Sequence, residues 1–123
     1  MKFRILLSVA VCAVLPACSF QNTYERDAQS FTDAVIKNDL TPVQNEIAPG
    51  IHITRVQVAE WSDELGEQGK LESLKETSVD CPAATHCFIV KFKNSTYKEE
   101  MRLDEKGRIS AWRFHAIPAA AKS

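Results

Sequence analysis

The chain has 123 residues, with 15 Lys and Arg against 16 Asp and Glu and a formal net charge of −1 at pH 7. This length suits one small domain with its own hydrophobic core. The charge balance shows no excess of basic residues of the kind that proteins need to bind nucleic acids. We therefore expect one domain and no nucleic-acid partner.

The chain opens with a segment typical of export signals, MKFRILLSVAVCAVLPACSF. Lys2 and Arg4 precede an apolar run over residues 5–15. As a helix this run would reach about 16 Å, whereas the hydrocarbon core of a bilayer is roughly 30 Å thick. A basic start followed by a short apolar run therefore predicts a cleaved signal and not a membrane span.

The signal-like segment ends in Leu15-Pro16-Ala17-Cys18, which resembles the lipobox of bacterial lipoproteins. The resemblance implies a signal peptide over residues 1–17 and acylation of Cys18, on its thiol and on its new amino group. Because Ser19 and not Asp follows, the resemblance also implies the periplasmic face of the outer membrane. The alternative is an ordinary secretory signal that leaves Cys18 as a free thiol.

Cleavage before Cys18 would remove two cations and no anion, so that 13 Lys and Arg would face 16 Asp and Glu. We expect a lipidated N-terminus and short tether over residues 18–21, one domain over residues 22–118, and a tail over residues 119–123. The membrane contact would be the lipid alone, since several acyl chains anchor stably. The mild acidity would suit a basic partner.

Residues 22–38 predict an amphipathic helix. Asn22 and Glu25 have the spacing of a capping box. The apolar stripe of this helix consists of Tyr24, Ala28, Phe31 and Val35. A second, short helix is predicted from Thr41-Pro42 to Pro49-Gly50, because Pro favours the first helical position.

From residue 51 the apolar periodicity changes toward two. Residues 51–61, IHITRVQVAEW, are rich in β-branched side chains and predict a strand with a bulge near Thr54. A polar link over residues 62–69 follows. Further strands are predicted over residues 70–79, 87–93, 97–103 and 108–116.

The last two strands allow a register to be predicted. If Gly107 takes the left-handed position of a type I turn with a G1 bulge, Asp104 faces Arg108. The pairs that follow from this register are Leu103 with Ile109, Met101 with Ala111, and Glu99 with Arg113.

This order of elements predicts a two-layer α+β domain, in which helices pack on an antiparallel meander of four or five strands. The order over residues 22–116, together with the closing RLDEKGRISAWRF, is similar to cystatin-like and nuclear-transport-factor-like domains. The resemblance implies a helix lying across a curved sheet, but a fold alone does not fix a function.

Cys81, His86 and Cys87 lie together in VDCPAATHCFIV. Zinc needs three or four ligands at suitable spacing, and no CxxC redox motif is present. If the lipoprotein resemblance holds, Cys12 leaves with the signal and Cys18 carries lipid. Two cysteines that flank a turn in an oxidising compartment then predict a disulfide, with a metal site or reactive thiols as alternatives.

No motif in the sequence predicts catalysis, a metal or a cofactor. Nuclear-transport-factor-like folds include enzymes that use a buried carboxylate or His with a Tyr. Side chains of these types are available at Tyr24, Asp33, His52, Tyr97 and His115, but none forms a dyad by position. We expect a protein that is not an enzyme.

The candidate partner-binding residues fall into two groups. The loop between the cysteines offers Pro82, Thr85 and His86, and the aromatic residues Trp61, Tyr97 and Trp112 are of types that concentrate at interface hot spots. For Trp112 and Phe114, two residues apart on one strand face, packing in the core is the favoured alternative.

The expected function is that of a lipid-anchored periplasmic binding protein, an accessory or structural component of a cell-envelope complex with a protein partner. The alternative is an immunity or inhibitor protein that neutralises a periplasmic toxin or hydrolase. A more remote alternative is small-ligand binding or catalysis in a cone-shaped cavity.

Overall fold

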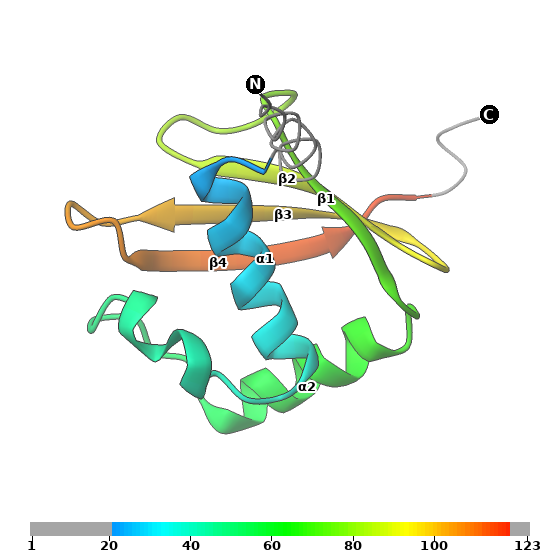
Figure 1. The fold of residues 1–123 in the computed structure, drawn as a ribbon, viewed down its shortest axis with the longest axis horizontal. Helices are drawn as coiled ribbons and strands as arrows, with labels where there is room; N and C mark the ends of the chain where they lie inside the picture. The colour runs from blue at the N-terminus through cyan, green and yellow to red at the C-terminus, as the bar shows by residue number, and fades with distance from the viewer. Residues whose placement is uncertain (1–20, 119–123) are drawn as a thin grey trace, which may run out of the picture.

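The computed structural model describes residues 21–118, which form a layer of helices on a sheet (Figure 1). The elements in chain order are α1 (Thr23–Ile36), the 3₁₀ helix η2 (Thr41–Glu46), α2 (Arg55–Gly66), β1 (Leu71–Thr77), β2 (His86–Phe92), β3 (Thr96–Leu103) and β4 (Ile109–Ala116). The four strands form one antiparallel meander in the order β1-β2-β3-β4. The predicted α+β fold is confirmed.

Helix α1 begins at the predicted capping box. The side chain of Asn22 accepts a hydrogen bond from the Glu25 backbone N–H at 2.7 Å, and the Asn22 backbone N–H donates to Glu25 Oε1 at 3.1 Å. Ala28, Phe31 and Val35 are fully buried against the sheet. These three residues of the predicted stripe dock α1 across one face of the sheet (Figure 1), whereas the fourth, Tyr24, is 40% exposed.

The strand predicted over residues 51–61 is wrong, because α2 begins within it. Thr54 is the N-cap, and its Oγ1 accepts a hydrogen bond from the Gln57 backbone N–H at 3.1 Å. The β-branched residues Ile51 and Ile53, which favoured a strand, precede this cap without forming one. The predicted polar link is also shorter than expected, since α2 extends to Gly66.

Packing explains why this segment is helical. Val58 and Leu65 are buried and Trp61 is half-buried, so one side of α2 faces the core. Their spacing of three and four residues is that of a helical stripe, and its burial outweighs the β propensity of the preceding residues.

The predicted second helix is the 3₁₀ helix η2, with Pro42 near its start. The chain that leaves it reaches the edge of the sheet, where Ile47 forms a parallel bridge with Ile109 and the Ala48 N–H donates to the Ile109 carbonyl at 2.8 Å. The start of β4 is thereby covered, which protects an otherwise open strand edge.

The hairpin between β3 and β4 confirms the predicted turn and corrects the register. Gly107 has φ +80°, the Asp104 N–H donates to the Arg108 carbonyl at 2.8 Å, and Leu103 faces Ile109. Beyond that pair a bulge shifts the strands by one residue. The observed pairs are Arg102 with Ala111, Met101 with Trp112, Glu100 with Arg113, and Glu99 with Phe114, so two predicted pairs, Met101 with Ala111 and Glu99 with Arg113, are wrong.

The sheet has an inner face toward the helices and an outer face away from them. The inner face carries Leu74, Phe88, Val90, Phe92, Tyr97, Met101, Ile109 and Trp112, all of them buried. Within residues 21–118, no helix is long and apolar enough to cross a membrane.

Candidate functional site

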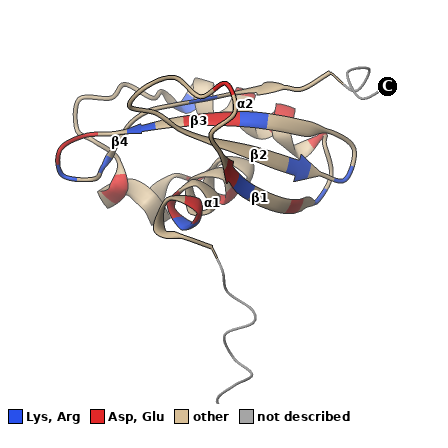
Figure 2. Ribbon diagram, turned by 90° about the horizontal axis from the view of Figure 1, so that it is seen from above, with Lys and Arg blue, Asp and Glu red and all other residues tan. Residues whose placement is uncertain are grey.

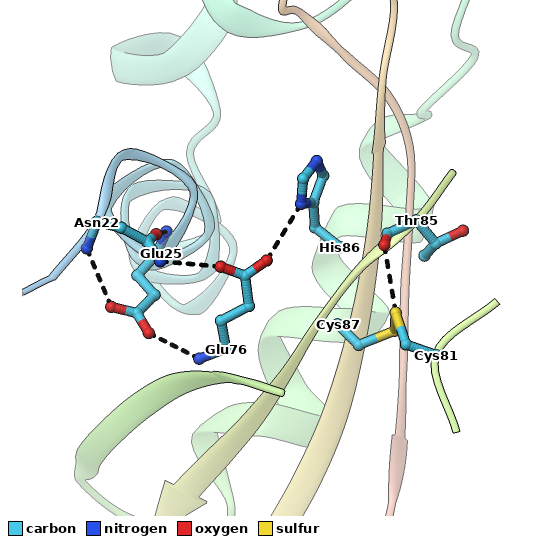
Figure 3. A network of polar contacts seen from close by, with 7 residues as sticks. All are labelled: Asn22, Glu25, Glu76, Cys81, Thr85, His86 and Cys87. Atoms are coloured by element: carbon cyan, nitrogen blue, oxygen red, sulfur yellow. Dashed lines mark hydrogen bonds and ion pairs between the residues drawn. A yellow bond between two sulfur atoms is a disulfide. The ribbon is translucent and has the colours of Figure 1, made fainter. Parts of the chain in front are cut away.

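The loop that joins β1 to β2 is closed by a disulfide between Cys81 and Cys87 (Figure 3). The Cα atoms of the two residues lie 5.8 Å apart, within the usual range for a disulfide. Cys87 belongs to β2 and is fully buried, whereas residues 82–84 at the tip of the loop are exposed. The predicted disulfide is confirmed, and it presents an exposed tip from a buried base.

Two non-glycine residues of this loop have left-handed backbone conformations, Asp80 with φ +51° and Ala84 with φ +60°. For a residue with a Cβ this conformation costs roughly 1–2 kcal/mol. Such strain persists only where the surroundings impose the conformation, and it is frequent at functional sites. The loop is thus held in a shape that its sequence does not prefer.

Strand β3 also holds the loop. Lys98 Nζ donates to the Asp80 carbonyl at 2.6 Å, and Arg102 Nε donates to Thr85 Oγ1 at 3.3 Å. Within the loop, Cys81 Sγ lies 3.2 Å from the Thr85 carbonyl oxygen (Figure 3). The loop is therefore fixed at several points across the outer face of the sheet.

His86 ties the base of the loop to the N-terminus of α1 (Figure 3). Its ring stacks on Tyr24 with centroids 3.9 Å apart, and its Nδ1 lies 3.2 Å from Glu76 Oε2. Asn22 Nδ2 donates to Glu76 Oε1 at 2.9 Å, and the Glu76 backbone N–H donates to Glu25 Oε2 at 2.8 Å. From the sequence His86 is a candidate partner-binding residue of the loop, whereas in the fold its side chain joins α1, β1 and β2.

Beside the loop lies a hollow of about 240 Å³. It is lined by Pro82 and Thr85 of the loop and by Glu100, Arg102, Ala111, Trp112 and Arg113 of β3 and β4. An ion pair between Arg113 Nη2 and Glu100 Oε1, at 2.7 Å, crosses this part of the sheet. Three of the predicted partner-binding residues, Pro82, Thr85 and Trp112, therefore border one concave feature.

The three aromatic candidates lie in or against the core. Tyr97 and Trp112 are 4% and 7% exposed, and Trp61 is half-buried with its ring centroid 5.2 Å from that of Trp112. Phe114 joins this cluster at 5.1 Å from Trp112, so the two β4 aromatics pack in the core. The Tyr97 hydroxyl donates to Glu64 Oε2 at 2.9 Å. Burial, and to a smaller extent this contact with Glu64, raises the pKa of Tyr97 to about 12.

One carboxyl group is buried in the core. Glu99 is 1% exposed, and its oxygens lie 2.8 and 2.9 Å from Thr32 Oγ1 and 3.3 Å from Trp112 Nε1. Burial raises the pKa of Glu99 to about 8, against the opposing effect of these hydrogen bonds. As a neutral acid, Glu99 can donate to Thr32 Oγ1, which in turn donates to the Ala28 carbonyl at 2.7 Å.

The side-chain types considered for catalysis do not converge. Among the residues that the structure describes, no hydrogen bond or ion pair joins any two of Tyr24, Asp33, His52, Tyr97 and His115. His52 and His115 are exposed, and Tyr24 stacks on His86. Over the same part of the chain, no cluster of three or more His, Cys, Asp or Glu residues could hold a metal ion.

A second hollow, of about 940 Å³, lies away from the disulfide loop, between the end of α1, the segment after η2 and the start of α2. Its wall mixes apolar side chains such as Ile47, Ile53 and Val58 with Asp39 and Arg55, both of them exposed. None of the candidate residues from the sequence lines it. The disulfide loop therefore remains the better candidate site.

Replacing Ala84 by Gly is expected to stabilise the protein by up to about 1 kcal/mol. The change relieves roughly 1–2 kcal/mol of left-handed strain and costs about 0.4–1 kcal/mol through the freer unfolded chain. Urea unfolding measures the difference. Ala83→Gly is the matched control, because Ala83 is exposed in the same loop without a positive φ and should only lose stability. Equal losses in both variants would contradict the strain at Ala84.

No family model, curated protein or solved structure matches the chain. The likeness to cystatin-like and nuclear-transport-factor-like domains therefore stays a prediction from element order. The proposed lipid site, Cys18, lies outside the described residues.

Proposed function

We propose that this protein is a lipid-anchored periplasmic binding protein, an accessory or structural component of a cell-envelope complex, that contacts its protein partner through the disulfide loop. The observation that carries the proposal is the rigid presentation of an exposed loop tip. The disulfide, the two contacts from β3 and the two left-handed residues all restrict this loop.

A restricted loop favours binding because less conformational entropy is lost when the partner docks. Pro82 and Thr85 lie where such a partner would meet both the loop and the adjacent hollow. Among the described residues, no hydrogen bond or ion pair joins any two of the five side chains considered for catalysis, and the one His–carboxylate contact, between His86 and Glu76, ties the loop base to β1, which favours binding over catalysis as the function.

The anchor has its own test. Cys18→Ser is expected to move the protein from the membrane fraction to the soluble periplasm and to remove the acyl mass from the mature chain, because the lipid is the only proposed membrane contact. Intact mass and fractionation measure both effects. If the mature wild-type protein has a mass without acyl chains, the lipoprotein assignment is contradicted.

The binding role is tested by a photo-crosslinking amino acid placed at position 82 in cells. We expect one defined adduct from position 82 and none from position 60, an exposed position on α2. An envelope-complex component in the adduct supports the accessory role. A single toxin or hydrolase would instead assign the immunity role, and the absence of any adduct specific to position 82 contradicts both.

A further inference from the structure

We propose that the outer face of the sheet binds an acidic segment of the protein partner through a row of cations. The proposal rests on the binding function above and adds the chemistry of the partner. Strand pairing aligns Lys75, Ile89, Lys98 and His115 across all four strands. Neighbouring strands are roughly 4.8 Å apart, so Lys75 and Lys98 stand about 10 Å from each other at their backbones.

The outer face is strongly biased toward positive charge. The Lys and Arg residues at its paired strand positions are Lys75, Lys91, Lys98, Arg102 and Arg113, and the one carboxylate at these positions is Glu100; Asp80 of the disulfide loop lies beside Lys98, which donates to its carbonyl. Glu100 pairs with Arg113, and in the described part of the chain no ion pair joins the other four cations to a carboxylate. Figure 2 shows the blue positions on successive strands of the sheet.

The helical layer carries an excess of negative charge. This excess cancels the positive charge of the outer face in the net charge of the chain, which is −1. Helix α2 and its C-cap carry four carboxylates, Glu60, Asp63, Glu64 and Glu67, against the single cation Arg55. A molecule with opposite charges on two sides orients an approaching charged partner. An acidic segment is therefore directed to the sheet and repelled from α2.

The hollow beside the loop suits a carboxylate. Arg102 uses its Nε on Thr85, and Arg113 contacts Glu100 through Nε and Nη2 while its side chain remains 74% exposed. Each guanidinium has five N–H donors, so both retain donors that face an incoming group. Arg recognises carboxylates through such paired donors.

A protein segment fits this surface better than a bilayer or a second copy does. The chain enters α1 on the helical side of the sheet, so the described part of the chain begins on the other side of the molecule from the outer face (Figure 2). A flat bilayer also has no side chain to fill a hollow bordered by a loop. Docking of α2 from a second copy would be a head-to-tail contact, which closes only as a ring and otherwise extends into a filament.

The test uses the mature lipidated protein in a neutral detergent, labelled with ¹⁵N, at low salt. The probe is a short peptide of alternating Glu and Thr, and the same peptide with Gln in place of Glu is the control ligand. We expect the Glu peptide to shift amide signals of β1–β4 and to release on addition of salt, since exposed charges are screened. The Gln peptide should cause no such shifts.

Two double variants with the same change in net charge locate the binding face. Lys75→Glu with Lys91→Glu is expected to weaken peptide binding at least about tenfold. Lys37→Glu with Arg55→Glu reverses two exposed cations of the helical side and should leave the affinity within about twofold of the unmodified protein. Neither Lys75 nor Lys91 makes a side-chain hydrogen bond among the described residues, so the first variant should fold.

Several results would overturn the proposal. Equal binding of the two peptides, or equal weakening of binding by the two double variants, would contradict it. So would concentration-dependent self-association that Lys75→Glu with Lys91→Glu abolishes. Binding of the Cys18→Ser protein through this face to phosphatidylglycerol vesicles, but not to the peptide, would assign the face to a membrane instead. A crosslink from position 82 that survives reversal of Lys75 and Lys91 would contradict this proposal and leave the proposed function intact. Peptide binding without any crosslink from position 82 would contradict contact through the disulfide loop and would leave the acidic specificity of the outer face intact.

Discussion

Glu99→Gln is expected to make the protein more stable than wild type at pH 8 and to abolish most of its loss of stability between pH 5 and pH 8. Glu99 is enclosed by α1, β3 and β4, and burial raises its pKa from 4.5 to about 8. Gln has nearly the same shape and is neutral at every pH. The variant therefore removes the titration and keeps the contacts with Thr32 and Trp112.

The direction follows from the protons bound in each state. Between pH 4.5 and about 8 the folded protein keeps a proton on Glu99 that the unfolded chain has released. The free energy of unfolding therefore falls as the pH rises through this range, by about a few kcal/mol in all. Above the folded pKa both states are ionised, and this loss is complete.

Urea unfolding of both proteins at several pH values measures the effect. At pH 5 the free energy of unfolding of the variant should lie within about 1 kcal/mol of the wild-type value. The remaining difference arises because one amide N–H of Gln gains no hydrogen-bond partner. Glu105→Gln is the control, since Glu105 is exposed in the β3–β4 turn and its removal should leave the slope unchanged. Parallel stability profiles for wild type and Glu99→Gln would show that Glu99 is ionised in the folded protein.

Removal of the disulfide is expected to lower the free energy of unfolding by about 2 kcal/mol. A disulfide that closes so short a loop restricts the unfolded chain by about this amount. For a domain of this size the loss corresponds to a fall in Tm of roughly 8–16 °C. Cys81→Ala with Cys87→Ala in the mature chain is the test, because Ala leaves no polar group at the fully buried position 87.

The same variant should relax the backbone strain in the loop. If the disulfide forces Ala84 into its left-handed conformation, Ala84→Gly should stabilise the double-Ala protein less than it stabilises wild type. A double-mutant cycle measures this coupling. Strictly additive effects would mean that the contacts from Lys98 and Arg102 alone impose the conformation.

Local chemistry made much of the fold predictable. The capping box at Asn22, the stripe along α1, the turn at Gly107 and the disulfide each depend on residues close in sequence, and each is confirmed. The strand predicted over residues 51–61 failed because β-branched residues gave a local signal, whereas the stripe of Val58, Trp61 and Leu65 gains only from tertiary packing.

The candidate site depended on contacts distant in sequence and was harder to predict. Glu76 lies 51 residues from Glu25 and 54 from Asn22, and Thr32 lies 67 residues from Glu99. No spacing rule connects such pairs. The cations of the outer face also come from four strands, and only the observed register places Lys98 and Arg102 of β3 beside Lys75 and Arg113.

Ser110 is the residue that the β3–β4 bulge leaves without a partner, and it sets the parity of everything after it. With Ser110 in place, Trp112 and Phe114 turn inward, whereas Arg113 and His115 point outward. If Ser110 were instead paired in regular alternation, Ala111 would face Met101 and Arg113 would face Glu99, which would exchange the two sets by burying the cations and exposing the aromatics. The bulge at this small polar residue thus keeps the core on one side of β4 and the charged surface on the other.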